Sequence, residues 1–299
     1  MVVRRILFGA AVLLSVNFVP GYTQDFGYDG TSGPNFWGKT FHNCVGKHQS
    51  PIDIELTDVK VKKFPPLKFE NFDMALEKVI LKNNGHTVVL TVAEGQLPSV
   101  SGGPLEGTYL FAQLHFHWGK NDLEGSENLI NNHSFPLELH MVFYKSSYND
   151  FLHAANHSDG LTVLSYLFEA VESENHRYDK FEEELVKVQN LGATAEVHDF
   201  VPVQQFIIDD KDAYFTYLGS LTTPPCSEVV IWIEFRQTVP LSHDQIQTFR
   251  QLSGTHGRLE HNFRPIQPLF DRVIYMNSGS YTYIKYTAFL LTILGIMCQ

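Results

Sequence analysis

Apolar and polar residues alternate with a period of two in several segments of the 299-residue chain, which is the pattern of β-strands that bury one face. In the segment 108–118 this alternation predicts one face with Leu110, Ala112, Leu114, Phe116 and Trp118, and a second face with Tyr109, Phe111, Gln113, His115 and His117. In the segment 137–144 it sets Leu137, Leu139, Met141 and Phe143 opposite Glu138, His140, Val142 and Tyr144. Residues 229–235 are β-branched and aromatic and predict a buried central strand. The Asn84-Gly85 pair predicts a turn inside the stretch 82–92.

Segments with helical spacing are fewer. Apolar residues recur every three or four positions at Leu161, Leu164, Phe168 and Val171, and again at Phe181, Leu185 and Val188. Ser242 with Gln245 forms a capping-box pattern, and we expect Gly254 to end the helix that follows. Residues 24–276 contain no linker or repeat. We therefore expect a single domain of the mainly β (α+β) class, a large, mostly antiparallel twisted β-sheet with peripheral helices.

Composition and charge limit the classes of function that the chain could have. Hydrophobic residues make up 43% of the chain and charged residues 18%, which is typical of a globular protein with a substantial core. The net charge of −11 argues against a nucleic-acid partner, because no excess of basic residues is available to neutralise phosphates. The same charge favours solubility in a salty medium.

The first residues have the pattern of a secretory signal peptide. Arg4 and Arg5 precede an apolar run from Ile6 to Val19, and small residues follow it. A buried helix or a membrane span would be the alternative, but the run is too short to cross a bilayer. We expect residues 1–23 to be removed and the mature chain to enter an oxidising, extracellular route.

The last residues, 277–299, have the pattern of a glycolipid (GPI) anchor signal. Small residues are followed by a short spacer and a terminal apolar run that ends without a polar tail. Asn277 or Ser278 would be the attachment site. The alternatives are a single C-terminal transmembrane helix, for which the run is short, and a plain buried helix. We expect the protein on the extracellular face of the plasma membrane, or else secreted.

The cysteines and the N-glycosylation sequons are consistent with secretion into an oxidising compartment. Cys298 lies in the tail that anchoring would discard, which leaves Cys44 and Cys226 as a pair in an oxidising compartment and predicts one disulfide. The sequons at Asn132 and Asn156 are acceptors for N-glycans.

Three histidines are the candidate metal site. His115 and His117 are two apart on a predicted strand, so that they project to the same side. Alone, such a pair is more often a polar strand face. His140 lies on the polar face of a second predicted strand, and three imidazoles would leave the fourth tetrahedral position of a zinc ion open, as in catalytic sites. Gln113 and Glu138 each lie two residues before a histidine, where they could fix its ring.

Seven short motifs carry a resemblance to the α-class carbonic anhydrases over residues 26–275. They occupy positions 49–52 (QSPI), 84–86 (NGH), 113–119 (QLHFHWG), 125–127 (GSE), 138–140 (ELH), 220–225 (SLTTPP) and 262–265 (NFRP). From the residues alone, the loop 218–226 could be any tight turn. The resemblance is to extracellular members, because Cys44 and Cys226 fall where those members place their disulfide.

The resemblance implies a role for each matching residue. His115, His117 and His140 would hold Zn²⁺, supported by Gln113, Glu138 and the backbone of Asn262. Thr222 would accept a hydrogen bond from zinc-bound hydroxide and Glu127 would orient Thr222. His86, near Tyr28, would be the proton shuttle. The apolar wall beside the reacting carbon dioxide would consist of Val142, Val163, Leu221, Val230 and Trp232.

The implied activity is zinc-dependent, reversible hydration of carbon dioxide to bicarbonate and a proton at the outer cell surface, that is, a carbonate dehydratase (zinc lyase). Zinc lowers the pKa of a bound water to about 7, and a histidine with a pKa near 6.5 can relay the released proton. Two alternatives remain. A catalytically silent binding module would be expected to lack one or more of the three histidines, and an esterase-type hydrolysis could accompany hydration as a side activity.

Overall fold

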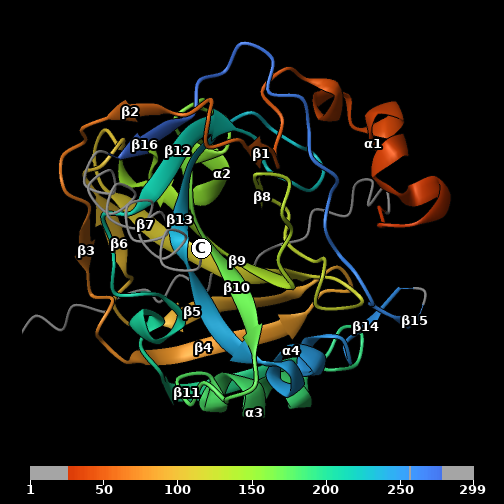
Figure 1. Ribbon diagram of the computed structural model, residues 1–299. Coiled ribbons are helices and arrows are strands. Elements are labelled where there is room, and N and C mark those ends of the chain that lie inside the picture. The colour runs from red at the N-terminus through yellow and green to blue at the C-terminus, as the bar shows by residue number, and fades with distance from the viewer. Residues whose placement is uncertain (1–25, 256, 278–299) are drawn as a thin grey trace, which may run out of the picture.

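The computed structural model describes residues 26–255 and 257–277. A sheet of twelve strands forms the centre of the molecule (Figure 1). Its strands are β2 (Lys60–Lys62), β3 (Lys68–Glu70), β4 (Leu76–Asn83), β5 (Val88–Glu94), β6 (Ser99–Ser101), β7 (Tyr109–Trp118), β9 (Leu137–Lys145), β10 (Leu161–Val171), β11 (Thr194–Phe200), β12 (Tyr214–Gly219), β13 (Val230–Ser242) and β16 (Tyr275–Asn277). The predicted signal peptide, and Ser278 with the tail after it, lie outside the described residues.

Neighbouring strands in this sheet follow the order β11-β4-β5-β7-β9-β10-β13-β12-β16-β2, while β6 pairs with β7 and β3 with β6. All pairs are antiparallel except β10 with β13 and β16 with β2. Two short pairs lie apart, β1 (Asp53–Ile54) with β8 (Leu129–Ile130) and β14 (Ser253–Gly254) with β15 (Gly257–Arg258). The predicted mainly β class with a mostly antiparallel sheet is confirmed.

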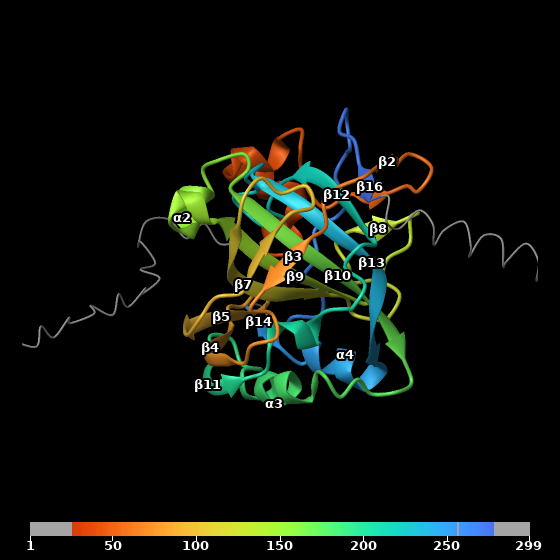
Figure 2. The ribbon, with the colours of Figure 1, turned by 90° about the vertical axis from the view of Figure 1, so that its left-hand side faces the viewer.

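Helices are short and lie around the sheet. They are α1 (Pro34–Thr40), α2 (Phe151–Ala154), α3 (Asp179–Lys187), α4 (His243–Phe249), and the 3₁₀ turns η1 (Gly30–Ser32), η2 (His42–Val45), η3 (Ser146–Tyr148) and η4 (Val203–Phe206). Figure 2 shows α3 and α4 side by side at one end of the molecule, with α2 toward the other end. Among the described residues, none of these helices has the length and apolar character needed to cross a bilayer.

Two local predictions about helices were wrong. The segment expected to be helical from Leu161 to Val171 is strand β10. Its first eight residues are all buried, because β9 and β13 flank it and both faces are covered, so the apolar run lacks the alternation that identifies a half-exposed strand. The capping box at Ser242 is present and begins α4 as predicted, but α4 ends at Phe249 and Gly254 belongs to β14.

The predicted turn at Asn84-Gly85 joins β4 to β5. The Asn84 side chain accepts hydrogen bonds from the backbone N–H groups of His86 and Thr87, both at 2.9 Å. Gly85 has a φ of +89°, a conformation that favours glycine. The sequence therefore fixes the geometry of the turn that presents His86.

A bulge in β7 changes the predicted faces of that strand. The register of β7 against β9 shifts between Phe111 and Gln113. Tyr109 and Phe111 therefore lie in the same buried cluster as Leu114 and Phe116, although the alternation had placed them on opposite faces. From Gln113 onward the predicted alternation holds.

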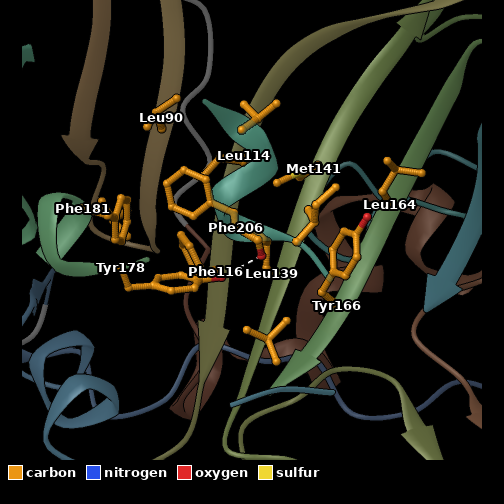
Figure 3. Packing of buried hydrophobic residues seen from close by; sticks show 14 of the residues in the cluster. Leu90, Leu114, Phe116, Leu139, Met141, Leu164, Tyr166, Tyr178, Phe181 and Phe206 are labelled. Carbon is orange, nitrogen blue, oxygen red and sulfur yellow. Dashed lines mark hydrogen bonds between the residues drawn. The ribbon is translucent and has the colours of Figure 1, made fainter. Parts of the chain in front are cut away.

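The main hydrophobic cluster lies on the face of the sheet covered by α3 and α4 (Figure 3). Phe116 is central to it, with ring centroids 5.1 Å from Phe181 and 4.9 Å from Phe249. Tyr178 joins the cluster and donates its hydroxyl proton to the carbonyl of Phe206 at 2.7 Å. This packing holds β7 and β9 rigidly, so the side chains on their opposite face are fixed in position.

Candidate metal centre

His115, His117 and His140 come together on the face of the sheet opposite the main cluster. β7 and β9 are antiparallel neighbours, and His115 is paired directly with His140. One nitrogen of each ring is available, and these three nitrogens all lie within 4.8 Å of one another. A tetrahedral zinc site with bonds of about 2.0–2.1 Å needs its ligands to be about 3.4 Å apart, so small ring rotations suffice to close this one.

The second nitrogen of each ring has a hydrogen-bond partner. His115 Nδ1 lies 2.9 Å from Gln113 Oε1, and His117 Nδ1 lies 2.8 Å from the carbonyl oxygen of Asn262. His140 Nε2 lies 2.7 Å from Glu138 Oε1. Because all three partners are acceptors, the rings donate there and direct their lone pairs toward the common centre.

Burial disfavours the charged form of the His115 and His117 imidazoles, and the neutral imidazole is the form that binds a metal. Burial, followed by the neighbouring histidines, holds the pKa of His115 well below its usual range. Burial and His140 lower the pKa of His117 to about 3. His117 Nε2 is buried without a hydrogen-bond partner among the described residues. A neutral ring with an unused lone pair facing two others fits a zinc ion.

Glu138 is the most heavily hydrogen-bonded group behind this centre. Its Oε2 accepts the backbone N–H groups of Glu127 and Asn128 at 2.7 and 2.9 Å. Its Oε1 accepts from the Asn128 side chain at 2.9 Å and from Ser165 Oγ at 2.7 Å, in addition to His140. Burial opposes the charged form, but His140, by its charge and its hydrogen bond, and then Ser165 and His117 hold the pKa of Glu138 below its usual range.

Glu127 lies beside the histidines and connects them to Thr222. Its Oε2 is 3.3 Å from His117 Nε2, and its Oε1 accepts the backbone N–H of Arg264 at 2.8 Å. The Thr222 hydroxyl donates to the same carboxylate. Burial and then Glu138 raise the pKa of Glu127, while the bonds from Thr222 and Arg264 act in the opposite direction.

The five predicted wall residues lie together. Val142, Val163, Val230 and Trp232 are almost fully buried in a second hydrophobic cluster, and Leu221 packs against it. The Trp232 ring lies next to His140, with centroids 4.9 Å apart. An apolar surface therefore borders the histidines on one side.

Comparison with known proteins agrees with this geometry. Residues 32–278 match the family model of the eukaryotic-type carbonic anhydrases. The chain belongs to this family. It is 36% identical to carbonic anhydrase 12 of Homo sapiens over 91% of this chain and 80% of that one, and 33% identical to carbonic anhydrase 6 of Bos taurus over 87% and 82%. It is also 36% identical to a putative carbonic anhydrase 3 of Caenorhabditis elegans over 82% and 94%. Family membership confirms the predicted enzyme class, carbonate dehydratase.

The predicted proton-shuttle residue of this carbonic anhydrase lies in the turn between β4 and β5. The His86 ring is stacked on Phe26, with centroids 4.0 Å apart, and the Tyr28 ring lies 6.5 Å away. The Tyr28 hydroxyl is buried, and burial together with Glu127 raises its pKa well above the usual value. The predicted neighbourhood of His86 and Tyr28 is thus present.

Other predicted sites of the carbonic anhydrase lie farther from the histidines. Cys44 and Cys226 form the predicted disulfide. Asn132 and Asn156, the predicted glycan acceptors, are both exposed. Asn277 is only 5% exposed in β16, where its side chain accepts from the N–H of Phe64 and donates to the carbonyl of Asp212.

Sequence reasoning missed several buried polar residues around the centre. Arg264 lies within a recognised motif, yet its role went unassigned. Its guanidinium donates to Gln49 Oε1, to the carbonyl of Ser50 and to the carbonyl of Cys44 at 2.8–3.0 Å, so it joins the disulfide region to Glu127. Asn128, Ser165 and Glu234 carried no local signal. Ser165 and Glu234 meet through the pairing of β10 with β13, and Asn128 reaches Glu138 and Glu234 from the loop before β8.

Proposed function

We propose that this carbonic anhydrase catalyses the reversible hydration of carbon dioxide to bicarbonate and a proton, with Zn²⁺ bound by His115, His117 and His140. The observation that carries the proposal is the arrangement of three imidazoles around one point. Each has its outer nitrogen bonded to an acceptor and its inner nitrogen within 4.8 Å of the other two. When bound there, zinc would lower the pKa of a water molecule to about 7 and so supply hydroxide at neutral pH.

Thr222 and Glu127 would orient that hydroxide. Because the Thr222 proton is directed to the Glu127 carboxylate, the Thr222 oxygen is left as an acceptor. A hydroxide that donates its only proton to Thr222 has its lone pairs free for attack. Arg264, whose backbone N–H binds Glu127, holds the carboxylate in place.

The apolar wall would bind the substrate and His86 would remove the proton. Carbon dioxide is small and without charge, so Val142, Val163 and Trp232 offer it a surface with no polar group to satisfy. His86 lies in a turn, partly exposed and stacked on Phe26, where an imidazole can pass a proton to buffer.

Replacement of Thr222 tests the orienting role. Thr222→Val keeps the shape and removes the hydroxyl, and we expect it to lower kcat/KM for hydration by about 100-fold or more, while Thr222→Ser remains close to wild type. Oxygen-isotope exchange between carbon dioxide and water measures both. Equal activity of the valine and serine variants would contradict the role.

We further propose that the enzyme acts at the outer cell surface on a lipid anchor. The disulfide agrees with an oxidising compartment, and the burial of Asn277 favours Ser278 as the attachment residue. In cells that express the full chain, phosphatidylinositol-specific phospholipase should release the activity. Activity that stays with the membrane would indicate a transmembrane tail, and activity in the untreated medium a secreted enzyme.

The purified wild-type and Thr222→Val proteins also distinguish carbon dioxide hydration from two other functions. Zinc binding without hydration would indicate a binding module, and ester hydrolysis that Thr222→Val abolishes together with hydration would indicate a side activity of the same site.

A further inference from the structure

A pocket of about 400 Å³ opens beside the disulfide, between three segments that are far apart in the sequence. The walls are the turn η2 with the residue after it, the residues that follow α2, and the loop before β13. They contribute His42, Asn43, Val45 and Gly46, then Ala155 and Asn156, and finally Ser227, Glu228 and Val229. The Cys44–Cys226 bond joins the first wall to the third. In the described part of the chain, the hydrogen bonds of Ala155 and Asn156 run back into α2, so they do not tie the second wall to the others.

The lining of this pocket combines apolar and polar groups, as the two kinds of surface on a sugar ring require. Val45 is 72% exposed and lies at the pocket with Val229. Glu228 offers a fixed carboxylate, because its Oε1 accepts from the N–H of His48 at 2.6 Å and from Gln49 Nε2 at 2.8 Å. Glu228 Oε2 accepts no hydrogen bond from the described residues, and the nearest cationic group is His48 Nδ1 at 3.9 Å. One carboxylate oxygen is therefore available to a hydroxyl donor.

Asn156, on the second wall, is the acceptor residue of the sequon Asn156-His157-Ser158. All three residues are exposed, and the His157 ring is stacked on Tyr148 with centroids 3.9 Å apart, which holds the turn in place. Asn156 Nδ2 donates one of its two hydrogens to the carbonyl of Leu152 at 2.7 Å. A glycosylated amide keeps one N–H, so this bond can persist when a sugar replaces the other hydrogen. It fixes the plane of the amide beside the pocket.

We propose that Asn156 is N-glycosylated and that the first N-acetylglucosamine of its glycan occupies this pocket. Asn156 Nδ2 forms a bond to C1 of the sugar, the bond from C1 to a lipid diphosphate donor breaks, and the amide gives up one proton. The C–H face of the ring would lie against Val45, and its hydroxyl and acetamido groups would reach Ser227 and Glu228. Attachment of the sugar rests on the secretory route in the proposed function, whereas the lining of the pocket does not.

The loop that would hold the sugar also supports Thr222. The carbonyl of Ser227 accepts the N–H of Leu221 at 3.0 Å, and the N–H of Cys226 donates to the carbonyl of Thr223 at 2.9 Å. Thr222 lies between these two bonds along the chain. A sugar bound to Ser227 would therefore connect the α2 wall to the loop that carries the Thr222 hydroxyl, and we expect it to stabilise both.

Mass spectrometry of the peptide that carries Asn156 tests attachment, with protein from cells that express the full chain. We expect a glycan on this peptide in wild type and none in Ser158→Ala, which destroys the sequon. A glycan on Asn132 together with an unmodified Asn156 would show that the secretory route operates and would overturn the proposed site alone. Carbon dioxide hydration is measured in the same samples, and its absence from the glycosylated protein would contradict only the proposed function.

Nuclear Overhauser contacts test where the sugar lies. Protein from cells that make high-mannose glycans is trimmed with an endoglycosidase, which leaves one N-acetylglucosamine at each occupied site. In the Asn132→Gln variant we expect contacts between protons of the remaining sugar and the methyl groups of Val45 and Val229. In the matched Asn156→Gln variant, the sugar on Asn132 should give none. A sugar on Asn156 without contact to either valine would refute the seat.

A thermodynamic cycle measures what the sugar contributes. In the Asn132→Gln background, we expect loss of the sugar by Ser158→Ala to raise the unfolding equilibrium constant in denaturant about 5-fold, as for one lost hydrogen bond. Val45→Ser should remove most of this effect but change the sugar-free protein little, because Val45 is exposed there. Val61→Ser, at another exposed valine, should leave the effect intact. An effect of the sugar that is the same with and without Val45 would contradict the proposal.

Discussion

Replacing Glu138 with glutamine removes its charge and one of its two acceptor oxygens but keeps the shape of the side chain, so the variant tests how much the charge and the acceptors contribute. The amide has nearly the same volume, but one of the two oxygens becomes an NH₂ donor. If the NH₂ replaces Oε2, it faces the backbone N–H groups of Glu127 and Asn128. If it replaces Oε1, it faces the Asn128 side-chain donor and His140 Nε2, while Ser165 can rotate its hydroxyl.

Either orientation therefore leaves two buried donors without an acceptor. Each such donor destabilises a protein by about 1–3 kcal/mol, so we expect the metal-free Glu138→Gln variant to lose about 2–6 kcal/mol of unfolding free energy. In the orientation that places the NH₂ group at Oε1, His140 also loses the acceptor that fixes its tautomer. Loss of such a partner weakens metal binding about 10- to 100-fold, or about 1.4–2.7 kcal/mol.

Zinc titration against a competing chelator measures the affinity, and denaturant unfolding of the metal-free protein measures the stability. Glu184→Gln is the matched control, since Glu184 is also almost fully buried but lies on α3, away from the histidines. We expect wild-type zinc affinity in the control. A Glu138→Gln variant that bound zinc as tightly as wild type would refute the account of how the histidines are held.

Three further predictions follow from the site and its surroundings. His86→Ala should slow hydration in weak buffer and be rescued by added imidazole in stopped-flow assays; a loss without rescue would contradict a shuttle. Replacing Cys44 and Cys226 by alanine opens a loop with a sequence separation of 182 and should lower the unfolding free energy by up to about 5 kcal/mol in denaturant titrations; unchanged stability would argue against that contribution. The pKa of His117 is about 3 when folded and about 6.5 when unfolded, so the unfolded state binds more protons between these values. The metal-free protein should therefore lose about 2 kcal/mol as the pH falls from 7 to 5, and a pH-independent melting temperature would contradict this.

The parts of the site that depend on strand alternation and turn motifs could be predicted from the sequence. His115 and His117 share a face because they are two apart on a strand, and alternation placed His140 and Glu138 on the polar face of the next one. The turn before β5 followed from Asn84-Gly85. These features depend on residues that are close together in the sequence, so a local sequence pattern is enough to predict them.

Features set by distant segments could not be predicted. Both faces of β10 are buried in hydrophobic clusters formed with other parts of the chain, so its apolar run was interpreted as helical. The bulge after Phe111 is a property of the pairing between β7 and β9. Ser165 and Glu234 meet only because β10 pairs in parallel with β13, and nothing near either residue indicates that pairing.

The most direct test of the central claim counts zinc and measures carbon dioxide hydration in the same samples of residues 24–277. Wild type would be compared with His140→Ala and with His198→Ala, whose exposed ring on β11 lies outside the site. The account predicts close to one zinc per chain and rapid hydration in wild type and His198→Ala, with both lost in His140→Ala. Full zinc occupancy and rapid hydration in His140→Ala would contradict it.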